Sequence, residues 1–200
     1  MNAFEQIEHD FSQIPRERKE RLKEIATFIS EKVRLGQPAR LIYICTHNSR
    51  RSHMSQLWAQ VAADHFGIQD VRTFSGGTEA TCFEPRAVAA LQRAGFEIKK
   101  EDDNPNPTYH LKHPFCRRPQ KAWSKVYSDE TNPQKGFAAI MTCSSADQDC
   151  PIVHGAEQRF VLPYEDPKKA DDTLNESTTY DERCRQIATE MFYCFSLVVN

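Results

Sequence analysis

The chain has 200 residues, of which 39% are hydrophobic and 10% aromatic, enough to form the core of one domain. Its formal net charge is −2, so bulk charge gives no reason to expect nucleic-acid or anionic-membrane binding. The sequence shows neither an apolar run long enough for a membrane span nor a basic and then apolar leader. These features predict a cytoplasmic protein whose seven cysteines are reactive or buried thiols, in preference to structural disulfides.

The first 38 residues differ in pattern from the rest of the chain. Apolar residues recur at helical spacing on both sides of Pro15, which predicts two amphipathic helices before Gly36. Neither helix carries residues suited to chemistry. We expect residues 1–38 to form a helical extension that packs on the main domain or on a partner subunit, as in a homodimer.

From residue 39 onward, strands and helices alternate. Strands are expected at 40–44, 71–77, 137–143 and 158–164, with one more directly after the helix that begins at Pro85. Helices are expected at 53–67, from Pro85 onward, and at 181–199. This order predicts an α/β fold in three layers, a sandwich with a central parallel sheet of four strands. Residues 39–200 then form one domain, with a long irregular insertion at 101–136 of the kind that serves as a lid or a linker.

The segment "LIYICTHNSRRSHMSQLW" (41–58) runs from an apolar strand through Cys45 and a polar loop into a helix. Parallel sheets bind ligands where such strand–loop–helix units meet the carboxyl edge. Loop N–H groups and the helix N-terminus favour an oxyanion, and the same positive environment stabilises a thiolate. The segment therefore predicts a reactive cysteine beside an anion site.

Three side chains of this loop have predicted catalytic roles. Cys45 is the candidate nucleophile, the planar guanidinium of Arg51 matches two oxygens of a tetrahedral anion, and the Ser52 hydroxyl can hydrogen-bond the Cys45 sulfur. The residues expected to surround the oxyanion are Thr46, His47, Asn48, Ser49, Arg50 and Arg51. The alternative interpretation is a buried cysteine at a strand end beside a surface arginine.

The loop "CTHNSRRS" (45–52) resembles the signature loop of the low-molecular-weight protein tyrosine phosphatases and of the thioredoxin-coupled arsenate reductases built on the same fold. "FSGGTEA" (74–80) resembles the segment that follows the second strand in that family. The resemblance implies the phosphatase-type sandwich and a loop-shaping role for Asn48. It covers roughly 39–100 and 137–200, and it leaves the N-terminal helices and the insertion unexplained.

Two residues of the loop depart from the family pattern. His47 stands where the family usually has glycine, from which we expect either a tighter second turn of the loop or a more polar mouth. Arg50 stands where many relatives carry a second cysteine. It adds positive charge and removes the nearest partner for a disulfide within the loop.

A second motif, "TCSSADQDCP", places Cys143 and Cys150 after a predicted buried strand. A tyrosine phosphatase needs one cysteine, because water hydrolyses its phosphocysteine. Arsenate reduction needs two electrons from thiols, and so further cysteines. The resemblance implies that Cys143 attacks Cys45 and that Cys150 then attacks Cys143, leaving a disulfide for thioredoxin. Two unrelated cysteines are the alternative.

A third motif, "YEDPKK" (164–169), contains an Asp-Pro pair. The resemblance makes Asp166 the acid that protonates the leaving oxygen, with a solvated acidic turn as the alternative. Phosphatases of the family usually continue with an aromatic residue after the proline, whereas this chain has Lys168 and Lys169. That difference favours a small inorganic oxyanion as substrate.

These motifs predict an arsenate reductase that uses thioredoxin as electron donor and needs no cofactor. A phosphatase acting on phosphotyrosine or a small phosphoester through a phosphocysteine is the main alternative, and a non-catalytic oxyanion or thiol-redox sensor is a third. The spacing of His110, His113 and Cys116 is only a weak indication of a metal site, and we expect no metal.

Overall fold

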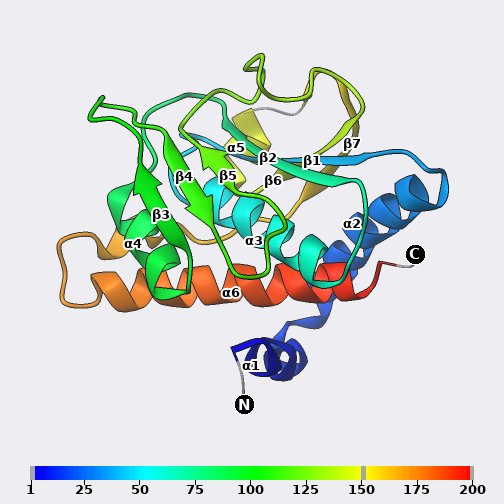
Figure 1. The fold of residues 1–200 in the computed structure, drawn as a ribbon, viewed down its shortest axis with the longest axis horizontal. Coiled ribbons are helices and arrows are strands. Elements are labelled where there is room, and N and C mark those ends of the chain that lie inside the picture. The colour runs from blue at the N-terminus through cyan, green and yellow to red at the C-terminus, as the bar shows by residue number, and fades with distance from the viewer. Residues whose placement is uncertain (1–2, 150–151, 199–200) are drawn as a thin grey trace.

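The computed structural model describes residues 3–149 and 152–198, and its helices surround a central sheet (Figure 1). The elements, with η for a 3-10 helix, are α1 Ala3–His9, η1 Asp10–Gln13, α2 Arg16–Arg34, β1 Ala39–Cys45, α3 Arg51–His65, β2 Val71–Gly77, α4 Pro85–Arg93, β3 Glu97–Lys100, β4 Tyr109–Lys112, β5 Gln120–Ala122, β6 Phe137–Met141, α5 Ser144–Asp149, β7 Ala156–Val161, η2 Pro167–Ala170 and α6 Glu176–Ser196. Within the described residues, no helix is long and apolar enough to cross a membrane.

The central sheet has the strand order β2-β1-β6-β7, and every neighbouring pair is parallel. This confirms the predicted four-stranded parallel sheet. Strand β1 is an almost continuous apolar run, as expected for a strand with both faces covered. In the register Cys45 pairs with Gly77, and Ile44 pairs with Met141, so the carboxyl ends of β1, β2 and β6 share one edge.

Alternate residues of β1 face two separate hydrophobic cores. Leu41 and Tyr43 belong to the larger core, which includes residues of α2, α3 and α6. Ile42 and Ile44 belong to the smaller one, which includes residues of β6 and α5. Helix α6, red in Figure 1, runs along the molecule and packs against α2, α3 and α4. The edge at which β1, β2 and β6 end therefore belongs to a sheet with a hydrophobic core packed on each face.

The two predicted N-terminal helices are present, although the first ends as the 3-10 turn η1 before Pro15. Leu22, Ile25 and Ile29 of α2 are fully buried in the larger core. Arg18 adds an ion pair with Glu190 of α6, with 2.6 Å between the guanidinium and the carboxylate. The apolar face of α2 is thus buried within its own chain. A homodimer through these helices stays a prediction and would need a different surface.

The region around the predicted insertion differs from expectation in two ways. Strand β3 lies outside the central sheet and pairs antiparallel with β4, which in turn pairs with β5. The expectation of an irregular segment at 101–136 is therefore wrong for the strands β4 and β5. Strand β3 lies outside the central sheet because it is largely exposed and lacks the apolar run that a central parallel strand needs. In β4, the buried Tyr109 and Leu111 alternate with the partly exposed His110 and the exposed Lys112, the pattern of a half-buried strand.

Candidate active site

The sulfur of Cys45 lies at the end of β1 and is almost completely buried. Its Sγ is 3.1 Å from the Oγ of Ser52 in the first turn of α3. That oxygen also accepts a hydrogen bond from Asn48 Nδ2 at 2.9 Å. Because Ser52 accepts from Asn48, its own O–H is available to donate to the sulfur. The Ser52 hydroxyl is therefore in a position to donate a hydrogen bond to the Cys45 sulfur and so to stabilise a thiolate there.

Asn48 shapes the loop from inside. Its φ of 44° is in the left-handed region, which asparagine tolerates better than most residues. Its Oδ1 accepts a hydrogen bond from the backbone N–H of Lys125 at 2.9 Å. The end of β2 lies close to the same loop, since a Cβ at Gly77 would lie 2.6 Å from the Thr46 carbonyl oxygen and 2.7 Å from the Asn48 nitrogen. The glycine at the end of β2 is required for this close approach.

The predicted clamp and the predicted acid lie together. Arg51 Nη2 donates to Asp166 Oδ2 at 2.7 Å, and Nη1 donates to the carbonyl oxygen of Tyr164 at 3.0 Å. The other Asp166 oxygen accepts from the N–H of Lys168 at 3.1 Å and so caps η2. Among the described residues, the buried Nε of Arg51 has no hydrogen-bond partner. The guanidinium thus has a free donor, in addition to the two engaged by the acid loop.

Cys143 follows β6 directly and lies beside the loop. Its side chain is 1% exposed, and its Sγ is 3.5 Å from Thr46 Oγ1 and accepts the N–H of Ala146 at 3.3 Å. Cys45 and Cys143 belong to the same buried cluster, because they leave neighbouring parallel strands at one edge. The third cysteine of the predicted relay, Cys150, lies outside the described residues.

The side chain of Arg50 is expected from the sequence at the oxyanion site, but it contacts Tyr180 and Glu84. Its Nε donates to Tyr180 Oη at 2.8 Å, and its Nη2 donates to Glu84 Oε2 at 2.9 Å. Asp171 adds a longer ion pair at 3.6 Å. The side chain therefore ties the loop to α6 and to the start of α4, and its contribution to an oxyanion would come through its backbone.

The remaining loop residues are placed at the same edge as Cys45. Ser49 is buried, and its carbonyl oxygen accepts from the N–H of Glu84 at 3.0 Å. The half-exposed imidazole of His47 lies 3.7 Å from the Glu79 carboxylate. The Thr46 carbonyl oxygen accepts from the N–H of Glu79 at 2.8 Å. Residues between β2 and α4 therefore hold the backbone of the loop at Thr46 and at Ser49.

Residues 124–125 of the predicted insertion brace this loop, a role that their sequence does not indicate. Ser124 Oγ donates to the His47 carbonyl oxygen at 2.9 Å, and Gly77 N donates to the Lys125 carbonyl oxygen at 2.9 Å. Lys125 is itself buried, and burial lowers the pKa of its ammonium to about 8. Nothing in the local pattern of residues 124–127 indicates these contacts, since their partners lie far away in the sequence.

The weak metal candidate in the insertion has a structural explanation. His110 lies 3.0 Å from the Glu101 carboxylate, and His113 packs among the rings of Trp58 and Phe96. Burial lowers the pKa of His113 to about 4 and raises the pKa of the Cys116 thiol to about 12. Across the described residues, no group of three His, Cys, Asp or Glu side chains is placed to hold a metal ion.

Known sequences support the motif analysis. A family model described as low molecular weight phosphotyrosine protein phosphatase matches residues 40–110. The arsenate reductase of Bacillus licheniformis is 26% identical over 148 residues, which cover 72% of this chain and 86% of that protein. The arsenate reductase of Bacillus subtilis is 26% identical over 146 residues, with the same coverage of 72% and 86%.

Solved structures share the fold. A low-molecular-weight protein tyrosine phosphatase from Bacillus subtilis matches with a TM-score of 0.54 and 15% identity over 79% of this chain and 95% of that chain. An arsenate reductase from Archaeoglobus fulgidus matches with a TM-score of 0.50 and 16% identity over 78% and 98%. Identities this low show the fold alone. Over residues 40–110 the chain is therefore similar to the low molecular weight phosphotyrosine protein phosphatase family, and its fold is the one that these phosphatases share with arsenate reductases.

Proposed function

We propose that the protein reduces arsenate to arsenite through a relay of Cys45, Cys143 and Cys150, with thioredoxin as electron donor. The observation that carries the proposal is the position of Cys143, buried with its sulfur 3.5 Å from Thr46 of the nucleophile loop. A hydrolase that regenerates Cys45 with water has no need for a second thiol there. The sequence relatives named as arsenate reductases support the same conclusion.

In the first step, the Cys45 thiolate attacks the arsenic atom and forms a sulfur–arsenic bond. The guanidinium of Arg51 binds two arsenate oxygens, replacing part of its present contact with Asp166. Asp166 in its protonated form delivers a proton to the departing oxygen, which leaves as water. Ser52 donates to the sulfur throughout, as its 3.1 Å contact with Cys45 allows.

In the second step, the Cys143 thiolate attacks the Cys45 sulfur. The electron pair of the sulfur–arsenic bond moves to arsenic, arsenite leaves, and a Cys45–Cys143 disulfide forms. Cys150 then attacks the Cys143 sulfur and releases Cys45 as a thiolate. Thioredoxin reduces the Cys143–Cys150 disulfide, so its two electrons balance the reduction of arsenate.

The relay requires the segment between the two cysteines to rearrange. Helix α5, Ser144–Asp149, has six residues, and isolated helices of this length are marginal in water. Ser144, Ser145 and Gln148 are exposed, so unwinding the helix exposes little apolar surface. A short polar helix is therefore suited to bring Cys150 toward Cys143.

The acid loop favours a small substrate. Lys168 and Lys169 follow Pro167 and are both exposed. Lys169 pairs with Glu165, with 2.5 Å between the ammonium and the carboxylate, and neither lysine can flank a phosphotyrosine ring as an aromatic side chain would. This arrangement suits an inorganic oxyanion that carries most of its charge on its oxygens.

Phosphomonoester hydrolysis is the second candidate, because Cys45, Arg51 and Asp166 are together sufficient for it. In that reaction Cys45 takes the phosphoryl group, Asp166 protonates the leaving alcohol, and water releases phosphate. Cys143 and Cys150 take no part.

The test compares the two chemistries in the wild type, Cys143→Ser and Cys150→Ser. Arsenate-dependent NADPH oxidation with thioredoxin and its reductase is measured beside hydrolysis of a nitrophenyl phosphate. We expect both variants to lose coupled arsenate turnover and to keep any phosphatase activity. Cys143→Ser should form no arsenite, whereas Cys150→Ser should form one arsenite per enzyme and trap a Cys45–Cys143 disulfide, visible by non-reducing peptide mapping.

The matched control is Cys82→Ser, since Cys82 is a partly exposed free thiol outside the proposed relay. It should leave both activities unchanged. Full thioredoxin-coupled turnover in Cys150→Ser would contradict the relay. Strong phosphatase activity without arsenate-dependent thiol oxidation in the wild type would favour the second candidate.

A further inference from the structure

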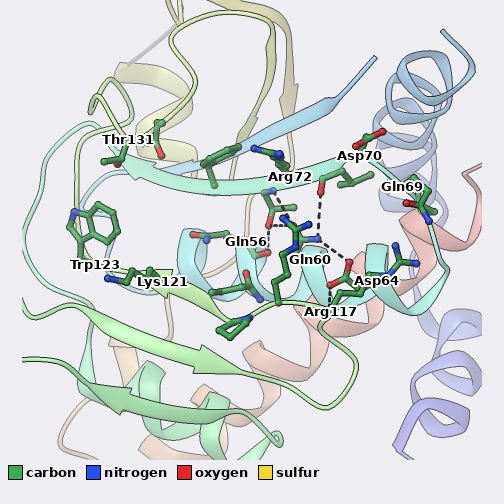
Figure 2. A pocket seen from close by; sticks show the side chains of 18 of the residues that line it. Gln56, Gln60, Asp64, Gln69, Asp70, Arg72, Arg117, Lys121, Trp123 and Thr131 are labelled. Atoms are coloured by element: carbon green, nitrogen blue, oxygen red, sulfur yellow. Dashed lines mark hydrogen bonds between the residues drawn. The ribbon is translucent and has the colours of Figure 1, made fainter. Parts of the chain in front are cut away.

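A second cavity lies away from the candidate active site, between α3, β2 and the end of the insertion (Figure 2). Its volume is about 530 Å³, within the usual range of small-molecule pockets. None of Cys45, Arg51, Cys143 or Asp166 lines it. A ligand held there would therefore be separate from the substrate of the thiol chemistry.

The lining of this cavity is strongly positive. Its charged residues are the cations Arg72, Arg117, Arg118, Lys121 and Lys125 and the carboxylates Asp64 and Asp70. Lys121 lies 3.6 Å from the Glu101 carboxylate, whereas within the described part of the chain the guanidinium groups of the three arginines form no ion pair with a carboxylate. Unpaired guanidinium groups around a concave surface attract an anion and can bind two of its oxygens at once.

Two buried amide side chains of the lining have an unused acceptor. Gln56 and Asn132 are 6% and 3% exposed, and within the described residues Gln56 Oε1 and Asn132 Oδ1 have no hydrogen-bond partner. The Asn132 amide is oriented by its Nδ2, which donates to the carbonyl oxygens of Ser75 and Tyr127, each at 3.1 Å. Buried acceptors without partners are costly. A ligand carrying N–H or O–H groups would satisfy both.

An aromatic ring and a buried ammonium stand near these amides. The Lys125 Nζ lies 4.1 Å from the centroid of the Trp123 ring. The lowered pKa of Lys125 reflects the cost of burying this charge, which a bound anion would offset. Trp123 is half-buried, and Figure 2 shows it at the end of the cavity beside Lys121. The lining thus combines cations, amide acceptors and a flat ring.

We propose that this cavity binds a nucleoside phosphate, with the phosphate at the arginines and the N–H groups of the base at Gln56 and Asn132. Inorganic phosphate has neither N–H groups for the two amide oxygens nor a flat ring to lie beside Trp123, and an uncharged nucleoside would leave the arginines without an anion. A nucleoside phosphate supplies the anion, the donors and a flat ring in one molecule. The proposal goes beyond the proposed reductase function and does not depend on it.

The experiment is calorimetric titration of the full chain with AMP, GMP, CMP and UMP, beside inorganic phosphate and the four nucleosides. We expect at least one nucleotide to bind with one site, and about tenfold or more tighter than inorganic phosphate or its own nucleoside. Arg51→Ala removes the anion clamp of the catalytic loop and should leave this binding intact.

The variant Arg117→Ala/Arg118→Ala should weaken nucleotide binding about tenfold or more, because two phosphate contacts are lost. Both residues are exposed, so the fold should be unaffected, which thermal unfolding checks. The matched control is Arg16→Ala/Arg34→Ala, which removes two exposed arginines on α2 and should bind as the wild type does. Gln56→Leu should reduce the preference for the nucleotide over inorganic phosphate.

Four results would overturn the proposal. Loss of nucleotide binding in Arg51→Ala would assign the binding to the catalytic loop. Equal affinity for inorganic phosphate and the nucleotides would reduce the cavity to a simple anion site. No binding by any nucleotide, or binding unchanged by Arg117→Ala/Arg118→Ala, would leave the cavity without this role.

Discussion

The loop 45–52 and the segment 143–149 stand at the same edge of the sheet but are held in very different ways. Asn48 and Ser52 bond within the loop, and residues after β2 and in the insertion bond to its backbone. In the described part of the second segment, the Asp147 side chain bonds to Arg159, and the Cys143 sulfur accepts from Ala146. The loop is braced by several distant elements, whereas the segment depends on one short helix.

This difference matches what each region is proposed to do. A nucleophile and its anion site must hold their geometry before the substrate arrives, since reorganisation during the reaction raises the barrier. A thiol that must pass a disulfide to another thiol needs a backbone that opens at low cost. The same sheet edge thus combines a fixed site with a segment suited to movement.

The largest expected effect comes from Cys45→Ser, which removes the proposed nucleophile from the fixed site. A hydroxyl is far less ionised than a thiol in this environment, so arsenate reduction and any phosphatase activity should fall below about one percent. Both assays are run on protein whose thermal unfolding matches the wild type. Clear residual turnover would place the nucleophile elsewhere.

Arg51→Lys should have the next largest effect. A lysine keeps the charge but cannot bind two oxygens in a plane, and it should lose on the order of 2–4 kcal/mol of transition-state binding in kcat/KM. Arg93→Lys, which alters a surface ion pair with Asp181, is the matched control and should keep the wild-type rate. A near-normal rate for Arg51→Lys would remove the clamp from the mechanism.

Asn48→Ala tests whether the bracing of the loop matters. It removes the bonds to Ser52 and to the backbone of Lys125 and replaces asparagine at a positive φ, so the free energy of unfolding should fall by about 1–3 kcal/mol. We expect kcat to fall as well, because Ser52 loses its orientation. Urea unfolding measures the first effect. Asn175→Ala, whose side chain makes no cap bond, should change neither quantity.

The smallest effect expected is a difference in backbone protection within the unaltered protein. Amide hydrogen exchange should be at least about tenfold faster at residues 144–149 than at residues 52–58, since a short polar helix opens more easily than a buried one. Mass spectrometry of exchanged peptides measures both segments in one sample. Equal protection would mean that the second segment is as fixed as the loop, and would weaken the relay.

The amino-acid sequence by itself determined the central sheet, the helices around it and the contiguous part of the site. Apolar runs and helical spacing are local signals, so strands such as Ala39–Cys45 and helices such as Arg51–His65 follow from neighbouring residues. Cys45, Arg51 and Ser52 lie within one loop between two such elements. Their chemistry could therefore be predicted without knowing the rest of the fold.

Only the tertiary structure decided which distant segments meet at that loop. The pairing of Arg50 with Tyr180, the position of Cys143 beside Thr46, and the bracing by Ser124 join residues far apart in the chain. The second sheet and the basic cavity arise in the same way, from the packing of the insertion against α3 and β2. A local pattern carries no information about such contacts, because they form only when burial brings separate elements together.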